Sequence, residues 1–421
     1  MTNSQNRIRT GPLARRLGTG DAVVVGLSAM IGAGVFAAFP PAAGAAGSWL
    51  VGALAIAAGV AFCNAVASAQ LAQSYPSSGG TYLFGREVLG PWWGFTAGWG
   101  FVVGKTASCA AMAMTVAAYA VPAGRAWERA AAVLAVVVLT ALNLRGVTRT
   151  ALVARLLLGL TGLVMLVFLG VTFGGSAGAV TALAAPDRGL LGVLQAAGLL
   201  FFAFAGYARI ATLAEEVRQP EMLGRAILVA LGITVTLYLL VGLALVRALG
   251  ARLPGSPTPL ADAVTAAGSE WAAPVVRVGA VAASLGALLA LLAGVTRTAL
   301  AMARERDLPP WLASVDPRHQ VPDHAQLALG AVLVAIVLVL DLRGAIGFSS
   351  FGVLVYYAVA NLSALRQPAD QRRSPRAVQL LGLVGCLGLV ATLPLASVLA
   401  GLTVLAVGLL GRRLLRPWRT Q

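Results

Sequence analysis

Long apolar segments follow one another along almost the whole chain, and they constrain its fold more than any other feature. A helix needs about 20 residues to cross roughly 30 Å of hydrocarbon. Only 11% of the residues are charged, against about 25% in soluble domains, so we predict an all-α polytopic membrane protein. The twelve predicted spans lie near residues 21–45, 48–73, 91–121, 127–144, 147–174, 190–213, 225–248, 273–300, 325–341, 344–364, 377–393 and 395–411.

The formal net charge of +16 indicates membrane topology rather than nucleic-acid binding. Of the 31 basic residues, 30 are arginines and one, Lys105, is a lysine. If both termini are cytoplasmic, 22 arginines fall on the cytoplasmic side and six on the opposite side. Because cytoplasmic loops are enriched in positive residues, we predict cytoplasmic termini in the plasma membrane (the inner membrane of a bacterium) and contact with anionic membrane lipids. We expect no nucleic-acid partner.

Two of the predicted spans are interrupted at mid-depth. The span at 21–45 contains Gly32, Ala33 and Gly34, and the span at 190–213 contains the stretch FAFAGY at 202–207. A glycine inside a helix lowers its stability by about 0.5–1 kcal/mol relative to alanine. A helix that has only a structural role therefore gains nothing from such residues. Close packing through small residues is the alternative explanation. Paired breaks at matching positions favour a substrate site near the midplane.

The positions of the two breaks also predict an internal repeat. Each break lies in the first span of a five-span unit, residues 21–174 and residues 190–364. An odd number of spans places the second unit upside down relative to the first, which is an inverted 5+5 repeat. The spans at 377–411 are then peripheral, and residues 1–20 and 412–421 are cytoplasmic tails.

A broken helix offers both kinds of group that an amino acid requires. The N–H groups at a helix N-terminus carry partial positive charge and suit a carboxylate. The carbonyl groups at the preceding helix C-terminus suit an ammonium group. An α-amino acid carries both charges on one carbon, and we therefore predict an amino acid as the small-molecule ligand.

Six stretches, in this order, resemble a permease of the amino acid–polyamine–organocation superfamily over nearly the whole chain. The resemblance implies a LeuT-type fold with discontinuous helices 1 and 6, ten core helices and two peripheral ones. It also implies alternating-access transport of amino acids or related amines. The stretches are GLSAMIGAGVF (26–36), YPSSGGTYLFGREVLGPWWGFTAGW (75–99), NLRGVTRTA (143–151), FFAFAGYARIATLAEEVRQPE (201–221), TRTALAMARERDLPPWLASVDPRHQVPDHA (296–325) and FSSFGVLVYYAVANLSALR (348–366).

The same resemblance implies a set of substrate-binding residues on three spans. Many relatives carry an acidic residue after the Gly-aromatic pair of span 6, where this chain has Ala208 and then Arg209, a departure that bears on the substrate. The loop after span 6 is also shorter than in most relatives. The implied binding residues are Met30, Ile31, Gly32, Ala33 and Gly34 in span 1, Cys109 and Met112 in span 3, and Phe202, Ala205, Gly206 and Ala208 in span 6.

Three further residues are candidates for a gate. Tyr356 and Tyr357 lie where relatives have a gating aromatic residue, although packing explains them equally well. Arg209 lies near Glu215 and Glu216; the two interpretations are a gate ion pair and an arginine that reaches toward the membrane surface.

The distribution of carboxylates narrows the expected substrate. All fifteen Asp and Glu residues, and both histidines, lie in loops or at span ends. A cationic substrate side chain would therefore find no carboxylate at mid-depth. We expect a zwitterionic amino acid with a neutral side chain, rather than a polyamine or an arginine-like substrate.

Lys105 is the exception among the charged residues, because it lies near the centre of its span. A charge at that depth costs roughly 2.5–3.5 kcal/mol, and desolvation disfavours the charged form of a lysine. Some relatives carry a lysine in span 5 in place of a sodium ion, and the matching position here is Thr161. We hypothesise that Lys105 takes over this proton-coupling role, bridging the span 1 break and Ser284. A static lysine bonded to backbone carbonyls is the alternative.

The sequence thus predicts a secondary transporter that acts by proton symport or exchange. The alternatives are a sensor that binds an amino acid without moving it, and a transporter of another small amine or organic solute. The spans hold no reactive constellation, so we expect no enzyme. We also expect no cofactor and no metal, since His319 and His324 have irregular spacing. The particular substrate, the coupling ion and the oligomeric state stay open.

Overall fold

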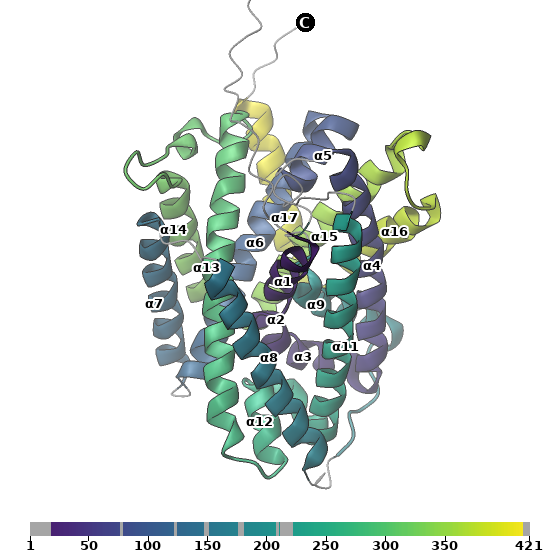
Figure 1. Ribbon diagram of the computed structural model, residues 1–421, viewed down its shortest axis with the longest axis vertical. Coiled ribbons are helices and arrows are strands. Elements are labelled where there is room, and N and C mark those ends of the chain that lie inside the picture. Colours follow the sequence, from purple (N-terminus) through teal and green to yellow (C-terminus); the bar gives the residue numbers. More distant parts are fainter. Residues whose placement is uncertain are drawn as a thin grey trace, which may run out of the picture.

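The computed structural model describes residues 18–75, 79–121, 124–146, 151–175, 181–207, 210 and 222–415. Regular structure in these ranges is helical (Figure 1). The helices are α1 (Thr19–Met30), α2 (Ala33–Ala37), α3 (Phe39–Ala46), α4 (Leu50–Ser74), α5 (Gly80–Leu89), α6 (Pro91–Ala120), α7 (Arg125–Leu144), α8 (Ala151–Gly174), α9 (Gly189–Phe204), α11 (Leu223–Leu249), α12 (Pro259–Ala266), α13 (Ala272–Arg304), α14 (Asp323–Val339), α15 (Leu342–Arg366), α16 (Arg376–Thr392) and α17 (Leu395–Leu415).

Each predicted span coincides at least in part with one of these helices. By length and composition, nine helical segments of the described chain are able to cross a membrane. Three further apolar helices are shorter, namely α9, α14 and α16. The prediction of a polytopic all-α protein is therefore confirmed, while the count of twelve spans and the inverted repeat stay predictions.

The first span is divided where its glycines predicted a break. Helix α1 ends at Met30, and α2 begins only at Ala33. Between them Gly32 takes an extended conformation, with φ −127° and ψ −145°. A second interruption follows at Ala38, before α3 starts with prolines at its first positions, where the missing proline N–H leaves no hydrogen bond unmade.

The second break follows α9. This helix ends at Phe204, and Ala205 to Tyr207 form a turn. Two backbone hydrogen bonds define the turn: the Gly206 N–H donates to the Phe204 carbonyl at 2.8 Å, and the Ile210 N–H donates to the Tyr207 carbonyl at 2.9 Å. Residues 208–209 and 211–221 lie outside the described ranges, and so do two predicted site residues, Ala208 and Arg209.

The broken helices occupy the middle of the bundle. Figure 1 shows α1, α2 and α9 at its centre, with α7 and α14 on one side and α16 on the other. Helix α6 packs along α15 and α13, and α4 packs against α9 and α11. In the most apolar window of α15, 83% of the residues are buried, against 17% in α17. Helix α15 is thus a core helix, and α17 lies at the periphery.

Candidate functional site

The two breaks touch each other through glycine. A Cβ added at Gly34 would lie 2.6 Å from the Ala203 Cα, and one added at Gly206 would lie 2.4 Å from the carbonyl carbon and oxygen of Ala29. Real Cβ atoms do not approach other atoms this closely. The two interrupted segments therefore meet backbone to backbone, and each glycine is needed for this close approach.

A tyrosine that the sequence did not single out lies at the same crossing. The Tyr238 hydroxyl on α11 is 2.7 Å from the Met30 carbonyl oxygen and 3.1 Å from the Ala203 carbonyl oxygen. These carbonyls belong to the C-terminal ends of α1 and α9, where a helix leaves its carbonyls without an intrahelical donor. Tyr238 is the one aromatic residue in α11, and that isolation is the signal that would have marked it.

Among the described residues, Lys105 hydrogen-bonds to the second break and not to the first. It is the fifteenth of the thirty residues of α6, is 8% exposed, and its Nζ donates to the Ala205 carbonyl at 3.0 Å. The predicted bridge from Lys105 to the span 1 break is thus replaced by a bond to span 6. The reason is that the end of α9 presents a carbonyl toward the middle of α6, whereas the Met30 carbonyl at the end of α1 accepts from Tyr238 and from the Gly32 N–H.

Ser284 and Thr161 lie on the helices that flank α1 and α2. Ser284 on α13 is fully buried, and its hydroxyl has no hydrogen-bond partner among the described residues. It lies three residues before Ala287, whose Cβ would be 3.1 Å from a Cβ at Gly32. The Thr161 hydroxyl on α8 donates to the Leu157 carbonyl of its own helix at 2.7 Å.

The remaining predicted binding residues separate into two hydrophobic clusters. Four of them, all at the breaks, belong to the central cluster of the molecule: Met30, Ile31, Phe202 and Ala205. Cys109 and Met112 follow Lys105 on α6 by one and two turns. They pack instead in a cluster that α6 forms with α7, α13 and α14. The structure therefore brings the span 1 and span 6 residues together, and it places this part of span 3 beside them in a neighbouring cluster.

The two candidate gating tyrosines link the second break to α5. The ring of Tyr357 stacks on that of Tyr207, with 5.0 Å between centroids and 28° between planes. Tyr356 stands edge-on to Tyr357 at 5.1 Å, and its hydroxyl accepts from the Thr81 N–H at 3.2 Å. A chain of aromatic contacts thus runs from the turn after α9 to the start of α5. The gating role itself stays a prediction.

In the described part of the chain, no carboxylate lies at the mid-depth of a span, where Lys105 is found. The carboxylates of the described residues lie in loops, in the short helices α5 and α12 and at the ends of the spanning helices; Asp21, for example, is in the first turn of α1 and pairs with Arg155 on α8. The described part of the crossing thus combines one lysine ammonium with the ends of two helices. The carbonyls at these helix ends carry partial negative charge and offset part of the ammonium charge.

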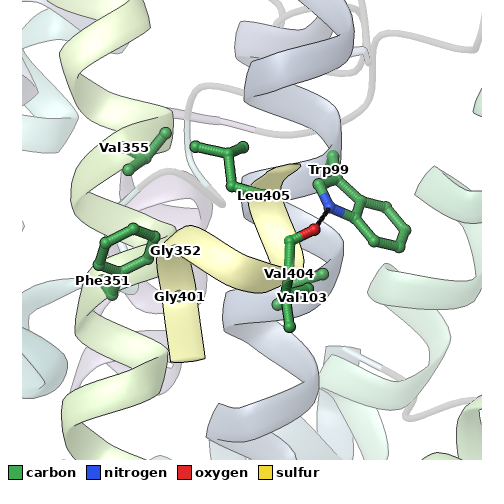
Figure 2. Close-up of a pocket in the computed structure, with 9 residues that line it drawn as sticks. Trp99, Val103, Phe351, Gly352, Val355, Gly401, Val404 and Leu405 are labelled. Atoms are coloured by element: carbon green, nitrogen blue, oxygen red, sulfur yellow. Dashed lines mark hydrogen bonds between the residues drawn. The ribbon is translucent and has the colours of Figure 1, made fainter. Parts of the chain in front are cut away.

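A small pocket elsewhere in the molecule has a different character. Figure 2 shows it among α6, α15 and α17, with the Trp99 Nε1 donating to the Val404 carbonyl at 2.8 Å. None of the predicted site residues lines it. Its lining is almost wholly apolar: Trp99, Gly100, Val103, Phe351, Gly352, Val355, Gly401, Val404 and Leu405.

Comparison with known proteins assigns a family. Residues 17–409 match the amino acid permease family. An uncharacterized transporter of Mycobacterium tuberculosis is 55% identical over 94% of this chain and 90% of its own length. The branched-chain amino acid permease BcaP of Bacillus subtilis is 26% identical over 94% of this chain and 92% of its own length. The vacuolar cationic amino acid transporter 4 of Arabidopsis thaliana is 27% identical over 84% of this chain and 63% of its own length.

These relatives are named as transporters or permeases, which agrees with the prediction that this chain is not an enzyme. The family match covers both breaks, Lys105 and the tyrosine pair. The motifs and the family match lead to the same assignment. The chain therefore belongs to the amino acid permease family.

Proposed function

We propose that this protein is a secondary active transporter that moves amino acids with uncharged side chains across the plasma membrane by alternating access. The observation that carries the proposal is the crossing of two broken helices at the centre of the bundle, with their backbones in contact at Gly34 and Gly206. Broken helices in corresponding halves of a membrane protein are the best pointer to a midplane binding site. The match to the amino acid permease family supports the same class of substrate.

The backbone around the first break supplies the groups for a carboxylate. The chain turns at Gly32, and the N–H groups of Ala33 and Gly34 begin the next helical segment. We infer that the substrate carboxylate binds to them and that Ser284 lies close to this position. The substrate ammonium group binds to carbonyl oxygens at the end of α9, which lies against the same stretch of backbone.

Lys105 accounts for the preference for an uncharged side chain. Two positive charges about 5 Å apart repel each other by about 3 kcal/mol at an effective dielectric constant of 20. The partial negative charge of the helix-end carbonyls offsets the substrate ammonium group. A cationic side chain adds a further charge near Lys105 and so needs a compensating carboxylate, and the described part of the spans offers none at mid-depth. Among the relatives, one is named for branched-chain amino acids and others for cationic ones; the charge of Lys105 favours the first type of substrate.

The coupling mechanism follows from the same lysine. We infer that the protonated form of Lys105 holds the Ala205 carbonyl, and that loss of the proton releases the turn after α9. Substrate movement would then be linked to proton symport or to exchange. Thr161 lies on α8, which packs against α1 and α13. Tyr356, Tyr357 and Arg209 are the proposed gate. The proposed topology has twelve spans, an inverted repeat and cytoplasmic termini.

Counterflow in proteoliposomes tests the transport function. Vesicles loaded with one unlabelled amino acid receive a trace of a labelled one, and the panel includes leucine, alanine, serine, arginine and lysine. We expect accumulation of labelled neutral amino acids and none of labelled arginine or lysine above empty vesicles. A repeat with an imposed pH gradient distinguishes symport from exchange. Substrate binding without movement of any label would favour a sensor, and arginine as the preferred substrate would overturn the role given to Lys105.

A further inference from the structure

Tyr238 joins the two broken helices through one hydroxyl group. Its oxygen lies within hydrogen-bonding distance of the Met30 carbonyl, at 2.7 Å, and of the Ala203 carbonyl, at 3.1 Å. Met30 is the last residue of α1, and Ala203 is the last but one of α9. A phenol carries one proton, which the two carbonyls share; the Met30 carbonyl also accepts from the Gly32 N–H at 2.9 Å.

The ring of Tyr238 is held in place by residues of the same two spans. It is fully buried. The Phe204 ring at the end of α9 lies 5.1 Å from it, and the Phe39 ring at the start of α3 lies 6.5 Å from it. Gly242, one turn further along α11, also approaches Phe39, since a Cβ there would lie 3.1 Å from that ring. The position of the hydroxyl is therefore determined by pieces of both broken helices.

The electrostatics of the crossing require such a donor. The C-terminal end of a helix carries a partial negative charge of about half an electron, and here two such ends converge on one point. Buried carbonyls without a donor destabilise the arrangement that exposes them. The phenol proton offsets the repulsion between the two partial negative charges. It thereby maintains the spacing of the two helix ends.

We propose that Tyr238 is a positioning residue for the substrate site. It holds the end of α1 and the end of α9 at a fixed separation. Two groups of the site are thereby kept at a fixed distance from each other. One binds the substrate carboxylate, after α1, and the other binds the substrate ammonium, at the end of α9. The inference rests on the proposed function, because it assigns to Tyr238 the geometry of that same amino acid site.

The test compares Tyr238→Phe with Thr236→Val on the same helix. The first substitution keeps the ring and its contacts with Phe204 and Phe39 but removes the hydroxyl. The second removes a hydroxyl that is exposed and donates to the Gly232 carbonyl of its own helix. Both variants are reconstituted at full length, and the counterflow of labelled leucine, or of the panel member that the wild type exchanges fastest, is measured against substrate concentration.

We expect Tyr238→Phe to raise KM about tenfold, with the maximal rate changed by less than about twofold, since a lost positioning contact weakens binding more than turnover. Thr236→Val should match the wild type. A loss of structure alone would lower the maximal rate and the unfolding temperature at unchanged KM, and that result would overturn the proposal. So would identical KM values for the two variants. If the wild type moves no amino acid, the proposed function fails instead, and the two failures are thus distinguishable.

Discussion

At the scale of single residues, Lys105 is the charged side chain that hydrogen-bonds to the second break. A lysine ammonium has three donors, and one of them is directed at the Ala205 carbonyl, 3.0 Å away. Because Ala205 lies in the turn that ends α9, we propose that the charge state of Lys105 influences the geometry of the second break. A residue with this connection is suited to couple a proton to a change in helix position.

We predict that Lys105→Met abolishes proton-dependent accumulation of substrate. Methionine retains much of the aliphatic chain but provides no donor, so the Ala205 carbonyl loses its charged partner. Such a loss is worth about 1.5–3 kcal/mol, and we expect uptake driven by a pH gradient to fall at least about tenfold. The measurement is uptake of a labelled neutral amino acid into proteoliposomes with the gradient imposed.

Thr106→Val is the matched control for this substitution. Thr106 neighbours Lys105 on α6, and its hydroxyl donates to the Val102 carbonyl of the same helix at 2.6 Å. Uptake by this variant should stay close to that of the wild type. If Lys105→Met still accumulated substrate in response to the gradient, the lysine would have only a structural role, as a fixed contact between α6 and the second break.

Lys105 and Tyr238 differ in how visible they are in the sequence. A lysine in the middle of a span is conspicuous because charges at that depth are unfavourable. A lone tyrosine in an apolar segment is a weaker signal, and its two carbonyl partners are 208 and 35 residues away. Which of the two breaks Lys105 contacts could not be predicted from the sequence either, since this depends on how α6 is rotated relative to α9.

At the scale of elements, the crossing of the two breaks depends on two glycines with different neighbours. Gly34 faces Ala203 of α9, and Gly206 faces the backbone of Ala29 and Met30 in α1. Neither glycine has a positive φ, so their role is close approach rather than an unusual backbone conformation. Any side chain at these positions must push the two segments apart.

We predict that Gly206→Ala impairs both stability and transport. The added Cβ would lie 2.4 Å from the Ala29 carbonyl, which is backbone and has little room to move. Overpacking of this kind costs about 1–3 kcal/mol. We therefore expect a lower unfolding temperature and a counterflow rate reduced about tenfold or more. A thermal-shift assay in detergent and counterflow in proteoliposomes provide the two measurements.

Gly232→Ala on α11 provides the comparison. Gly232 is exposed, and no atom lies within 4 Å of its added Cβ. Alanine is the better helix former by about 1 kcal/mol, so this variant should be unchanged or more stable. Equal behaviour of the two alanine variants would mean that the crossing does not require close contact.

The sequence predicted the long helices but not the short ones. The long helices follow from hydrophobic length, and the ends of α1 and α9 follow from small residues in apolar runs. The short helices α5 and α12 lie between predicted spans and have no hydropathy signal of their own. The contact between the two breaks was not predictable in detail, because helix-interior glycines are equally compatible with packing against any neighbouring helix.

At the scale of the whole molecule, a buried charge cluster joins helices from distant parts of the chain. The carboxylate of Asp307, which follows α13, accepts from the Tyr82 hydroxyl at 2.8 Å, from an Arg86 guanidinium nitrogen at 2.8 Å and from the Arg412 Nε at 2.9 Å. The Arg412 guanidinium also lies 4.4 Å above the centre of the Trp92 ring. The cluster fastens α5, α6 and α17 to the end of α13, at one end of the bundle (Figure 1).

Burial, together with the charge of Asp307, raises the pKa of Tyr82 above its ordinary value. Tyr82 therefore keeps its proton at physiological pH and remains a donor to the carboxylate. The sequence interpretation counted Arg86 and Arg412 only as topological charges. Their common partner was not predictable, since it lies 221 residues from one and 105 from the other.

We predict that Asp307→Asn destabilises the protein more than an equivalent change on its surface. The carboxylate is fully buried, and both guanidinium groups are largely buried, with side-chain exposures of 19% for Arg86 and 2% for Arg412. Removing one partner of a buried ion pair costs about 3–5 kcal/mol, because the charges that stay buried lose a close partner; Arg86 keeps its ion pair with Glu305 at 3.2 Å. The unfolding temperature should fall accordingly, and Asp370→Asn, which changes an exposed carboxylate, should leave it unaltered.

A double-mutant cycle with Arg412→Met determines whether the cluster acts as one unit across the molecule. If Asp307 and Arg412 stabilise the fold through each other, the double variant loses less stability than the two single variants together. The difference should be about 1–3 kcal/mol, the range expected for residues within one network. Additive losses would mean that α17 is held to the core independently of this ion pair, by other contacts such as the hydrogen bond from the Trp99 Nε1 to the Val404 carbonyl. A coupled loss would make the last helix of the chain part of the structure that holds α5 and α13 together.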